Sequence, residues 1–364
     1  MLIVLPDRTV GGAQMFALRL AVAFARDDEV IVTSAELLPA DPNFSARLGA
    51  ETQFIDTSKD PAALAALIVR ERIDAINSHT WWADRLVYAA LDLLSTASRP
   101  RWVVSMHGCY EQLLGRPQAD SAFASLAPAL LRKADAVAIA AVKNRRVFEA
   151  MELPDAQVIE IPYGFEPREP KSVRRVDGDI VFGLVSRPAP DKGWKASIDA
   201  FRMVRERLAA NGRRAALVLV GGGPYADALR QNHAGERDIT FSGWSDHPEE
   251  WIAGFDVALL PTWFAAESLP NSIIEYLAQG RPVIASRWAE IPRMLGEGPE
   301  SAGMLLNVDR ERGVELKELA DAMERLALDD ALRARLGANA ARRMGRFTMN
   351  SCVASYRTLF TTSA

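Results

Sequence analysis

Short apolar runs alternate with longer amphipathic segments along the first half of the chain. Continuous runs of Val, Ile and Leu, unlike strict alternation of apolar and polar residues, are typical of parallel strands covered on both faces. The runs predict strands at residues 2–5, 30–33, 52–55, 75–77, 102–105, 136–140 and 158–161. Amphipathic periodicity predicts helices at residues 13–25, 61–71 and 84–95. This order of strands and helices predicts a doubly wound α/β domain.

The alternation stops at residues 163–179, where prolines, glycines and charged residues follow one another without periodicity. We interpret this segment as an interdomain linker. The pattern then restarts, with strands predicted at 180–185, 216–220, 239–242, 257–260, 283–285 and 304–306, and helices at 195–209, 272–279, 317–327 and 332–343. The sequence therefore predicts two α/β domains in tandem that meet at a cleft.

The composition agrees with a globular protein of two domains. A chain of 364 residues exceeds what one hydrophobic core usually serves. The hydrophobic share of 49% and the charged share of 25% exclude a disordered or fibrous chain. A formal net charge of -4 argues against a general nucleic-acid binder. The two cysteines and the lack of a signal-peptide or membrane-spanning apolar run lead us to expect a soluble, cytoplasmic protein.

Loops after two strands of the second domain carry candidate binding residues, because such loops line the ligand crevice of parallel sheets. Arg187 and Lys192 follow the strand at 180–185 and could neutralise one diphosphate. Two solvated cations in an exposed loop are the alternative. Three glycines at 221–223 follow the next strand and would let a ligand, or only a neighbouring strand, approach the backbone.

The segment 266–275, AESLPNSIIE, is the most informative part of the second domain. Pro270 is typical of the first turn of a helix, so Glu267 should precede that helix and Glu275 should lie one to two turns inside it. The helix start would present the backbone N–H groups of Ser268, Leu269 and Asn271. Two carboxylates beside such a cradle suit a ligand with both hydroxyls and phosphates. The alternative makes Glu267 a partner of the helix dipole and Glu275 a surface residue.

Two features of the first domain could also meet a ligand. Gly11 and Gly12 follow the first strand and open a helix, where either an anion or only a tight turn would be accommodated. His107 lies at the carboxyl end of a strand, a position that suits a cleft as well as a buried structural role. Cys109 is near it in sequence, but a Cys–His dyad also needs orienting partners and access, which no motif indicates.

The sequence offers no convincing metal site. Asp177 and Asp179 resemble the Asp-x-Asp motif of some sugar transferases, but they precede a strand where the metal motif should follow one. We interpret them as part of a turn. The other His, Cys and carboxylate spacings match no zinc site.

A basic stretch in the first domain contains Lys143, Arg145 and Arg146. It could contact anionic lipid or a phosphorylated acceptor, and would then place the protein peripherally at the inner membrane. The other interpretation is a solvated helix face, which is the more common role of such stretches.

Together, the order of these motifs resembles that of the retaining nucleotide-sugar glycosyltransferases of family 4. The phrases that carry the resemblance are VGGAQMFALRLA, SMHG, GLVSRPAPDKGWKASIDAF, LVLVGGGPYADAL, FSGWSDHPEEWIAGFDVALLPTW, ESLPNSIIEYLAQGRPVIAS and FTMNSCVASYRTLF. The resemblance implies the GT-B fold, with two Rossmann-like domains at 1–165 and 166–345 that face a central cleft. It also implies that the C-terminal segment 346–364 forms a helix that crosses back to the first domain.

The resemblance also implies roles for individual residues. Arg187 and Lys192 would neutralise the donor diphosphate, Glu267 would bind the transferred sugar, and Glu275 would bind the ribose. Further donor contacts would come from Gly12, Gly222, Trp244, Ser268, Leu269 and Asn271, with Trp244 bordering the base. His107 would contact the sugar near the reacting centre, which makes His107, Arg187, Lys192 and Glu267 the predicted catalytic residues.

The implied activity is transfer of a sugar, with retention and without metal or cofactor, from a nucleotide-diphosphate donor to a saccharide or lipid-linked acceptor. In a bacterium this would serve assembly of cell-surface polysaccharide or lipopolysaccharide. Gln14 departs from the family pattern, which often has Glu there, and Gly222 stands where an acidic residue is frequent. A nucleotide-sugar epimerase of the same fold and a non-catalytic nucleotide-sugar-binding protein are the alternatives. A nicotinamide dehydrogenase is disfavoured, because no G-x-G-x-x-G follows the first strand of either domain.

Overall fold

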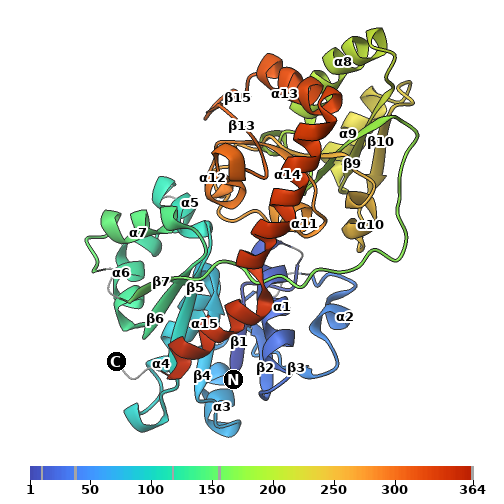
Figure 1. Ribbon diagram of the computed structural model, residues 1–364. Helices are drawn as coiled ribbons and strands as arrows, with labels where there is room; N and C mark the ends of the chain where they lie inside the picture. Colours follow the sequence, from blue (N-terminus) through green and yellow to red (C-terminus); the bar gives the residue numbers. More distant parts are fainter. Residues whose placement is uncertain (10, 37–38, 117–118, 155–156, 362–364) are drawn as a thin grey trace. The chain divides into compact units, whose positions relative to one another are not determined.

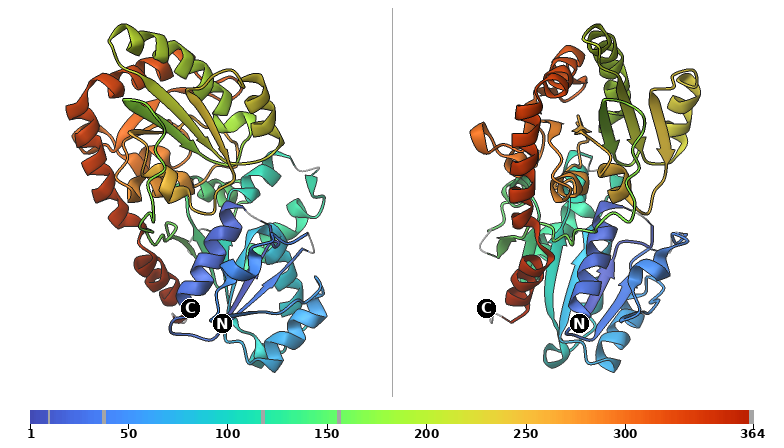
Figure 2. Two further views of the ribbon diagram at one scale, coloured as in Figure 1. Left: turned by 90° about the vertical axis from the view of Figure 1, so that its right-hand side faces the viewer. Right: turned by 45° about the vertical axis from the view of Figure 1, so that its right-hand side comes forward.

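The computed structural model describes residues 1–9, 11–36, 39–116, 119–154 and 157–361. The contacts divide the chain into two compact units (Figures 1 and 2). The first unit comprises Met1–Phe165 and Phe347–Ala364, and the second comprises Glu166–Arg346. Within the described ranges, no helix combines the length and the apolar composition needed to cross a membrane.

The first unit is built on a parallel sheet of seven strands in the order β3-β2-β1-β4-β5-β6-β7. Its strands are β1 (Leu2–Leu5), β2 (Val30–Ser34), β3 (Thr52–Phe54), β4 (Ala75–His79), β5 (Arg101–Met106), β6 (Ala136–Ile139) and β7 (Val158–Glu160). Its helices are α1 (Gly12–Phe24), α2 (Phe44–Leu48), α3 (Pro61–Arg70), α4 (Thr80–Leu91), α5 (Cys109–Gly115), α6 (Phe123–Lys133), α7 (Arg145–Ala150) and α15 (Met349–Thr361). Helices α1 and α15 pack together on one face of the sheet, and α3, α4 and α6 cover the other (Figure 1).

The second unit repeats this design with a six-stranded parallel sheet in the order β10-β9-β8-β11-β12-β13. Its sheet strands are β8 (Ile180–Val185), β9 (Ala215–Val220), β10 (Ile239–Gly243), β11 (Val257–Leu260), β12 (Val283–Ser286) and β13 (Gly303–Leu306). A short hairpin follows, made of β14 (Val308–Asp309) and β15 (Gly313–Val314). The helices are α8 (Trp194–Ala210), α9 (Pro224–Asn232), α10 (Pro248–Ile252), α11 (Asn271–Ala278), α12 (Ile291–Leu295), α13 (Leu316–Leu328) and α14 (Asp330–Arg343).

The predicted strands are confirmed, with ends that shift by up to two residues, because buried apolar runs mark strand centres better than strand ends. The prediction for α4 was wrong at both ends. The helix begins at Thr80, since the buried Trp81 and Ala83 belong to its inner face, and it ends at Leu91, since Leu93 lies exposed beyond it.

The segment interpreted as a linker is bound to the second unit along part of its length. Arg174 donates from Nε to the buried carboxylate of Glu250 at 2.8 Å, and its backbone N–H donates to the carbonyl of Glu250 at 2.9 Å. Arg175 donates to the carboxylate of Asp256 at 2.9 Å and to the carbonyl of Gly254 at 3.0 Å. These bonds fix the end of the segment to the region of α10 and the start of β11.

Asp84 is a fully buried carboxyl group in α4 that should make the first unit sensitive to pH. It accepts hydrogen bonds from Ser78 at 2.6 Å and Tyr110 at 2.7 Å, but burial raises its pKa to about 7. The folded protein therefore holds this proton more tightly than the unfolded chain, whose Asp pKa is about 4. The contribution of Asp84 to stability is thus most favourable below pH ~4 and is lost as the pH rises to ~7.

We therefore expect Asp84→Asn to raise the free energy of unfolding at pH 8 by on the order of 1–2 kcal/mol and to change it little at pH 4. Urea unfolding at the two pH values measures this difference. Asp92→Asn, which alters an exposed partner of Lys133, is the matched control. Equal effects of Asp84→Asn at both pH values would contradict the role of this carboxyl group.

Candidate functional site

The predicted residues of the second unit gather at the carboxyl edge of its sheet. Arg187 and Lys192 follow β8, Gly222 follows β9, Trp244 follows β10 and Glu267 follows β11. Strands β8, β9 and β11 run parallel and are neighbours, so the loops after them emerge at the same edge. The strand order reverses between β8 and β11, which is where ligands bind in open α/β sheets.

A mostly buried ion pair joins the loops after β8 and β11. The Nζ atom of Lys192 lies 2.5 Å from Oε2 of Glu267, and the two side chains are only 12% and 8% exposed. The hydroxyl of Thr262 lies 3.1 Å from the carbonyl oxygen of Asp191 and 3.4 Å from the same Oε2, and its one proton can be shared between them. Among the described residues, no donor binds Oε1 of Glu267. One carboxylate oxygen is therefore held by the protein, and the other remains available to a ligand.

Both predicted cations of this edge lie against one aromatic ring. The guanidinium carbon of Arg187 is 5.6 Å from the centre of the Phe264 ring, and Nζ of Lys192 is 4.4 Å from it. Arg187 is exposed, so its guanidinium can still bind an anion in addition to the ring. The sequence analysis did not identify Thr262 or Phe264. Their position directly after β11, opposite the loop of Lys192, is the signal that would have found them.

Gly193 allows the two loops to approach closely. Its φ of 79° lies in the left-handed region, and a Cβ atom there would be 2.5 Å from the carbonyl oxygen of Pro261. Trp263 donates its backbone N–H to the carbonyl of Asp191 at 2.8 Å across the same contact. A side chain at residue 193 would therefore separate Lys192 from Glu267.

Helix α11 begins beside the end of β8. Ser272 donates its hydroxyl to the carbonyl of Val185 at 2.6 Å, and the Tyr276 hydroxyl accepts the backbone N–H of Val185 at 2.7 Å. The helix starts at Asn271, one residue before the predicted 272, and Pro270 is its N-cap, so it directly precedes the first turn in which it was expected. Glu275 lies half-buried in the second turn, as expected.

The segment before α11 is buried and contains an unsatisfied polar group. Glu267, Ser268 and Leu269 are all buried. The hydroxyl of Ser268 has no hydrogen-bond partner among the described residues. A buried hydroxyl without a partner is costly in a folded protein, and the contact of Ser268 with a ligand stays a prediction.

Gly222 and Trp244 form a close contact at the ends of β9 and β10. A Cβ atom at residue 222 would lie 2.9 Å from the backbone nitrogen of Trp244. An acidic side chain, frequent at this position in the family pattern, would therefore displace Trp244. The Trp244 side chain is 53% exposed, with its indole N–H directed to Asp246 at 3.3 Å. A large aromatic surface is thus presented at this edge.

In the first unit, α1 starts at the predicted glycines, and the structure explains the unusual Gln14. Gly11 is the N-cap of α1 and the exposed Gly12 is its first residue. Gln14 donates its amide N–H groups to both carboxylate oxygens of Asp7, at 3.0 and 3.1 Å. A glutamate at residue 14 would place a second negative charge beside Asp7, so the amide is the side chain that fits here.

His107 is buried, and both of its ring nitrogens are engaged within the first unit. Its Nε2 lies 3.1 Å from Nδ1 of His79, and its Nδ1 lies 2.5 Å from the hydroxyl of Tyr163. Burial lowers its pKa to about 3, so the imidazole is neutral at pH 7. Cys109 is no partner of His107, and burial raises the pKa of its thiol well above the usual range. The contact of His107 with a sugar stays a prediction.

The sequence analysis did not identify His79, because it ended β4 at residue 77. The strand continues to His79, and its register places that residue opposite Ser105 in β5. Only Ala75 and Ile76 of this strand are apolar, and the polar residues Asn77, Ser78 and His79 end it, so no apolar run marks its end.

The basic stretch of the first unit is partly compensated by a carboxylate. Burial is the main influence on the pKa of Glu111 and raises it, while the nearby charges of Lys143 and Arg146 act in the opposite direction. Arg145 donates to the carbonyl of Val158 at 3.3 Å. Part of this stretch is therefore engaged with its own unit.

Asp177 and Asp179 have a structural role. Both bind Arg214: Asp177 through the guanidinium at 2.8 Å, and Asp179 through the backbone N–H at 2.8 Å. In the part of the chain that the structure describes, no three His, Cys, Asp or Glu residues are grouped so that they could hold a metal ion.

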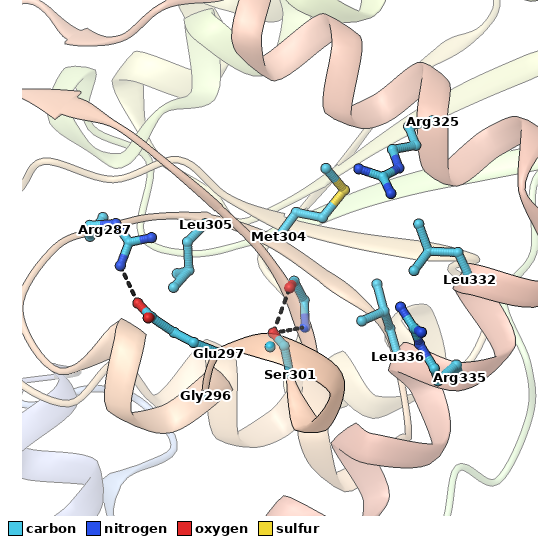
Figure 3. A pocket seen from close by; sticks show the side chains of 12 residues that line it. Arg287, Gly296, Glu297, Ser301, Met304, Leu305, Arg325, Leu332, Arg335 and Leu336 are labelled. Carbon is cyan, nitrogen blue, oxygen red and sulfur yellow. Dashed lines mark hydrogen bonds and ion pairs between the residues drawn. The ribbon is translucent and has the colours of Figure 1, made fainter.

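A separate cavity of about 360 Å³ lies beside β13 in the second unit (Figure 3). Met304 and Leu305 of β13, with Leu332 and Leu336 of α14, give it an apolar lining. Arg287, which binds Glu297, and the exposed Arg325 and Arg335 add polar groups. None of the predicted site residues lines this cavity.

Sequence comparisons link both units to glycosyltransferases. A family model described as "Glycosyl transferases group 1" matches residues 179–329, and one described as "Glycosyl transferase 4-like domain" matches residues 11–164. The lipopolysaccharide core biosynthesis glycosyltransferase LpsE of Rhizobium meliloti is 32% identical over 98 residues, which are 27% of this chain and 26% of that protein. The alpha-D-kanosaminyltransferase of Streptomyces kanamyceticus is 30% identical over 162 residues, which are 43% and 39%. These matches span well under half of either relative.

A comparison of structures extends the likeness to the whole chain. HepE from Anabaena, solved in complex with UDP and glucose, has a TM-score of 0.75 and covers 99% of both chains. At 19% sequence identity this likeness shows the fold. Two parallel-sheet, Rossmann-like units and the two family matches lead to one conclusion: the chain belongs to the group 1, family 4-like glycosyltransferases of the GT-B fold.

Proposed function

We propose that this protein is a retaining glycosyltransferase that moves a sugar from a nucleotide-diphosphate donor to a saccharide or lipid-linked acceptor. The observation that carries the proposal is the Lys192–Glu267 pair at the switch point of the second sheet. There the mostly buried Lys192, the exposed Arg187 and an open carboxylate oxygen lie within one small region. This combination suits a ligand that has both phosphate charge and sugar hydroxyls.

In the proposed reaction, the bond between the anomeric carbon and the diphosphate oxygen breaks while the acceptor oxygen bonds to the same face of that carbon. The proton of the acceptor hydroxyl passes to the departing phosphate. Arg187 and Lys192 stabilise the negative charge that develops on the diphosphate. Oε1 of Glu267 accepts a hydroxyl of the transferred sugar, and Glu275 accepts the ribose hydroxyls. The backbone N–H groups of Ser268, Leu269 and Asn271, at the start of α11, donate to oxygens of the donor.

We further propose that the acceptor belongs to bacterial surface polysaccharide or lipopolysaccharide, as the name of LpsE suggests for that relative. A cytoplasmic protein that contacts the inner membrane through Lys143, Arg145 and Arg146 would suit a lipid-linked acceptor. Co-sedimentation with anionic vesicles tests this contact. An Arg146→Glu variant that binds as well as the wild type would contradict it.

A thermal-shift screen of nucleotide sugars is the first experiment, because a ligand that binds only the folded state raises the melting temperature. The stabilising donor is then incubated alone and with candidate acceptors, and the products are identified. We expect transfer with retention that persists when a chelator is added. Conversion of the donor to another nucleotide sugar without an acceptor would favour an epimerase. Binding without any product would favour a non-catalytic protein.

Trp244 should contribute to binding of the nucleotide base. Stacking of a base on an aromatic side chain is worth about 1–3 kcal/mol, so Trp244→Ala should weaken nucleotide binding roughly 5- to 150-fold. Titration calorimetry with the free nucleoside diphosphate measures the change. Trp82→Ala, which removes another partly exposed tryptophan from α4, is the matched control. Unchanged affinity in Trp244→Ala would remove this residue from the donor site.

A further inference from the structure

Two histidines lie together at the carboxyl edge of the first sheet, beside the point where its strand order reverses between β1 and β4. His79 ends β4, and His107 directly follows β5. Their side chains are 0% and 5% exposed, and the rings stack with centres 5.4 Å apart. Phe16 of α1 packs edge-on against both rings. The pair is thus enclosed at the edge where ligands of such sheets bind.

The two imidazoles and Tyr163 form one chain of hydrogen bonds, from the Tyr163 hydroxyl through His107 to Nδ1 of His79. Burial lowers the pKa of both histidines, so each ring carries a single N–H at neutral pH. If His107 donates to His79, then His107 accepts the Tyr163 hydroxyl proton and His79 carries its N–H at Nε2. If His79 donates to His107, its Nε2 has no proton and accepts.

In both arrangements, Nε2 of His79 is the ring nitrogen that the chain of bonds leaves unused. This atom is buried and has no partner among the residues that the structure describes. The hydroxyl of the next residue, Thr80, is also buried and without a partner among the described residues. A hydroxyl group of a ligand both donates and accepts, so it can satisfy His79 in either arrangement and Thr80 as well. Two adjacent unsatisfied groups at this edge therefore indicate a hydroxyl-bearing ligand.

Thr80, which carries the second of these groups, has a strained backbone. Its φ of 73° lies in the left-handed region, which a β-branched residue rarely adopts. Such a conformation costs on the order of 1–3 kcal/mol and is typical of functional sites. His79 and Thr80 are both buried, so the groups that cover them must move before a ligand can reach them.

We propose that Nε2 of His79 and the hydroxyl of Thr80 form a subsite for a saccharide hydroxyl, and that Tyr163 and His107 are positioning residues for His79. This inference rests on the proposed transferase function and deepens it. The hydroxyl belongs either to the transferred sugar or to the acceptor, and the assays below distinguish the two sources.

Substitution of His79 by Asn or by Gln distinguishes the roles of its two ring nitrogens. The amide of Asn occupies the place of Nδ1, and that of Gln reaches the place of Nε2. His79→Asn keeps a partner for His107 but loses the subsite, so we expect the KM of the saccharide substrate to rise roughly 5- to 150-fold, the effect of leaving a hydroxyl unpaired. His79→Gln should retain most of the affinity. His233→Asn, which alters a histidine bound to Glu236 in the second unit, should change nothing.

Donor hydrolysis without acceptor and transfer with acceptor are measured for each variant. A raised donor KM in both assays assigns the hydroxyl to the transferred sugar. A raised acceptor KM alone assigns it to the acceptor. A wild-type KM in His79→Asn overturns the inference while the measured transfer leaves the function standing. If the wild type neither hydrolyses nor transfers any donor, the function fails. The subsite is then judged by the ¹⁵N resonance of Nε2 of His79 upon titration with methyl glycosides. A shift supports it, and no shift overturns it.

Variants of Thr80 separate a binding role from a purely structural one, because melting temperature and KM should change independently. Thr80→Gly removes both the strain and the hydroxyl, so we expect a melting temperature at or above that of the wild type together with a raised KM. Thr80→Ser keeps the hydroxyl and should keep the KM. A Thr80→Gly variant with wild-type kinetics, or with lower stability and an unchanged KM, would overturn the role of Thr80.

Discussion

Replacing Lys192 with methionine should reduce sugar transfer by about 10²–10³-fold or more and should also destabilise the second unit. Transfer falls because the cation that stabilises the departing diphosphate is lost. Stability falls because Glu267, only 8% exposed, loses its cationic partner and retains Thr262 alone. Removing one partner of a buried pair typically costs roughly 3–5 kcal/mol. Glu267→Gln should also lower both transfer and stability, because it leaves the Lys192 cation without its carboxylate partner.

The double variant Lys192→Met/Glu267→Gln separates chemistry from folding. It contains no unpaired buried charge, so its free energy of unfolding should recover most of what each single variant loses. Its transfer activity should stay as low as that of the single variants. Urea unfolding and the transfer assay are run in parallel on all four proteins. Recovery of activity with stability would show that the pair serves folding alone, and full activity of Lys192→Met would remove it from the donor site.

Replacing Tyr356 with alanine should destabilise the first unit by about 3–5 kcal/mol, although this residue lies near the end of the chain. Tyr356 is a buried residue of α15 whose ring lies near Phe16 of α1 and whose hydroxyl lies 2.7 Å from that of Ser105 in β5. Alanine would leave a cavity between α1, α15 and the sheet. Hydrogen exchange should then accelerate in β1, β4 and β5 before it changes in β8, β9 and β11.

Tyr356→Phe is the matched control for packing. It keeps the ring and removes only the hydroxyl, so it should cost about 1 kcal/mol, because Ser105 still accepts the amide of Asn77 at 2.9 Å. Equal loss of protection in both sheets after Tyr356→Ala would show that α15 does not stabilise the first unit specifically.

Much of the fold could be predicted from the sequence because its signals are local. Runs of buried aliphatic residues identify the strands, and the break after Tyr163 shows where the alternation is interrupted. The loops that carry Arg187, Lys192 and Glu267 could be placed at one edge of a sheet, since parallel strands end together. The end of β4 was missed because polar side chains interrupt its apolar run, and those same side chains make this edge of the sheet chemically interesting.

The sequence by itself determined the succession of strands and helices, the family, and which loops carry charge. Only the tertiary structure decided that Lys192 pairs with Glu267, 75 residues away, that Phe264 lies under two cations, and that His79 binds His107. It also decided that Gly222 must leave room for Trp244 and that Gln14 binds Asp7. Strand and helix patterns follow from residues close in the chain. Pairing and burial depend on strand order and loop packing, which bring distant residues together, and only there do charge, strain and unsatisfied polar groups arise.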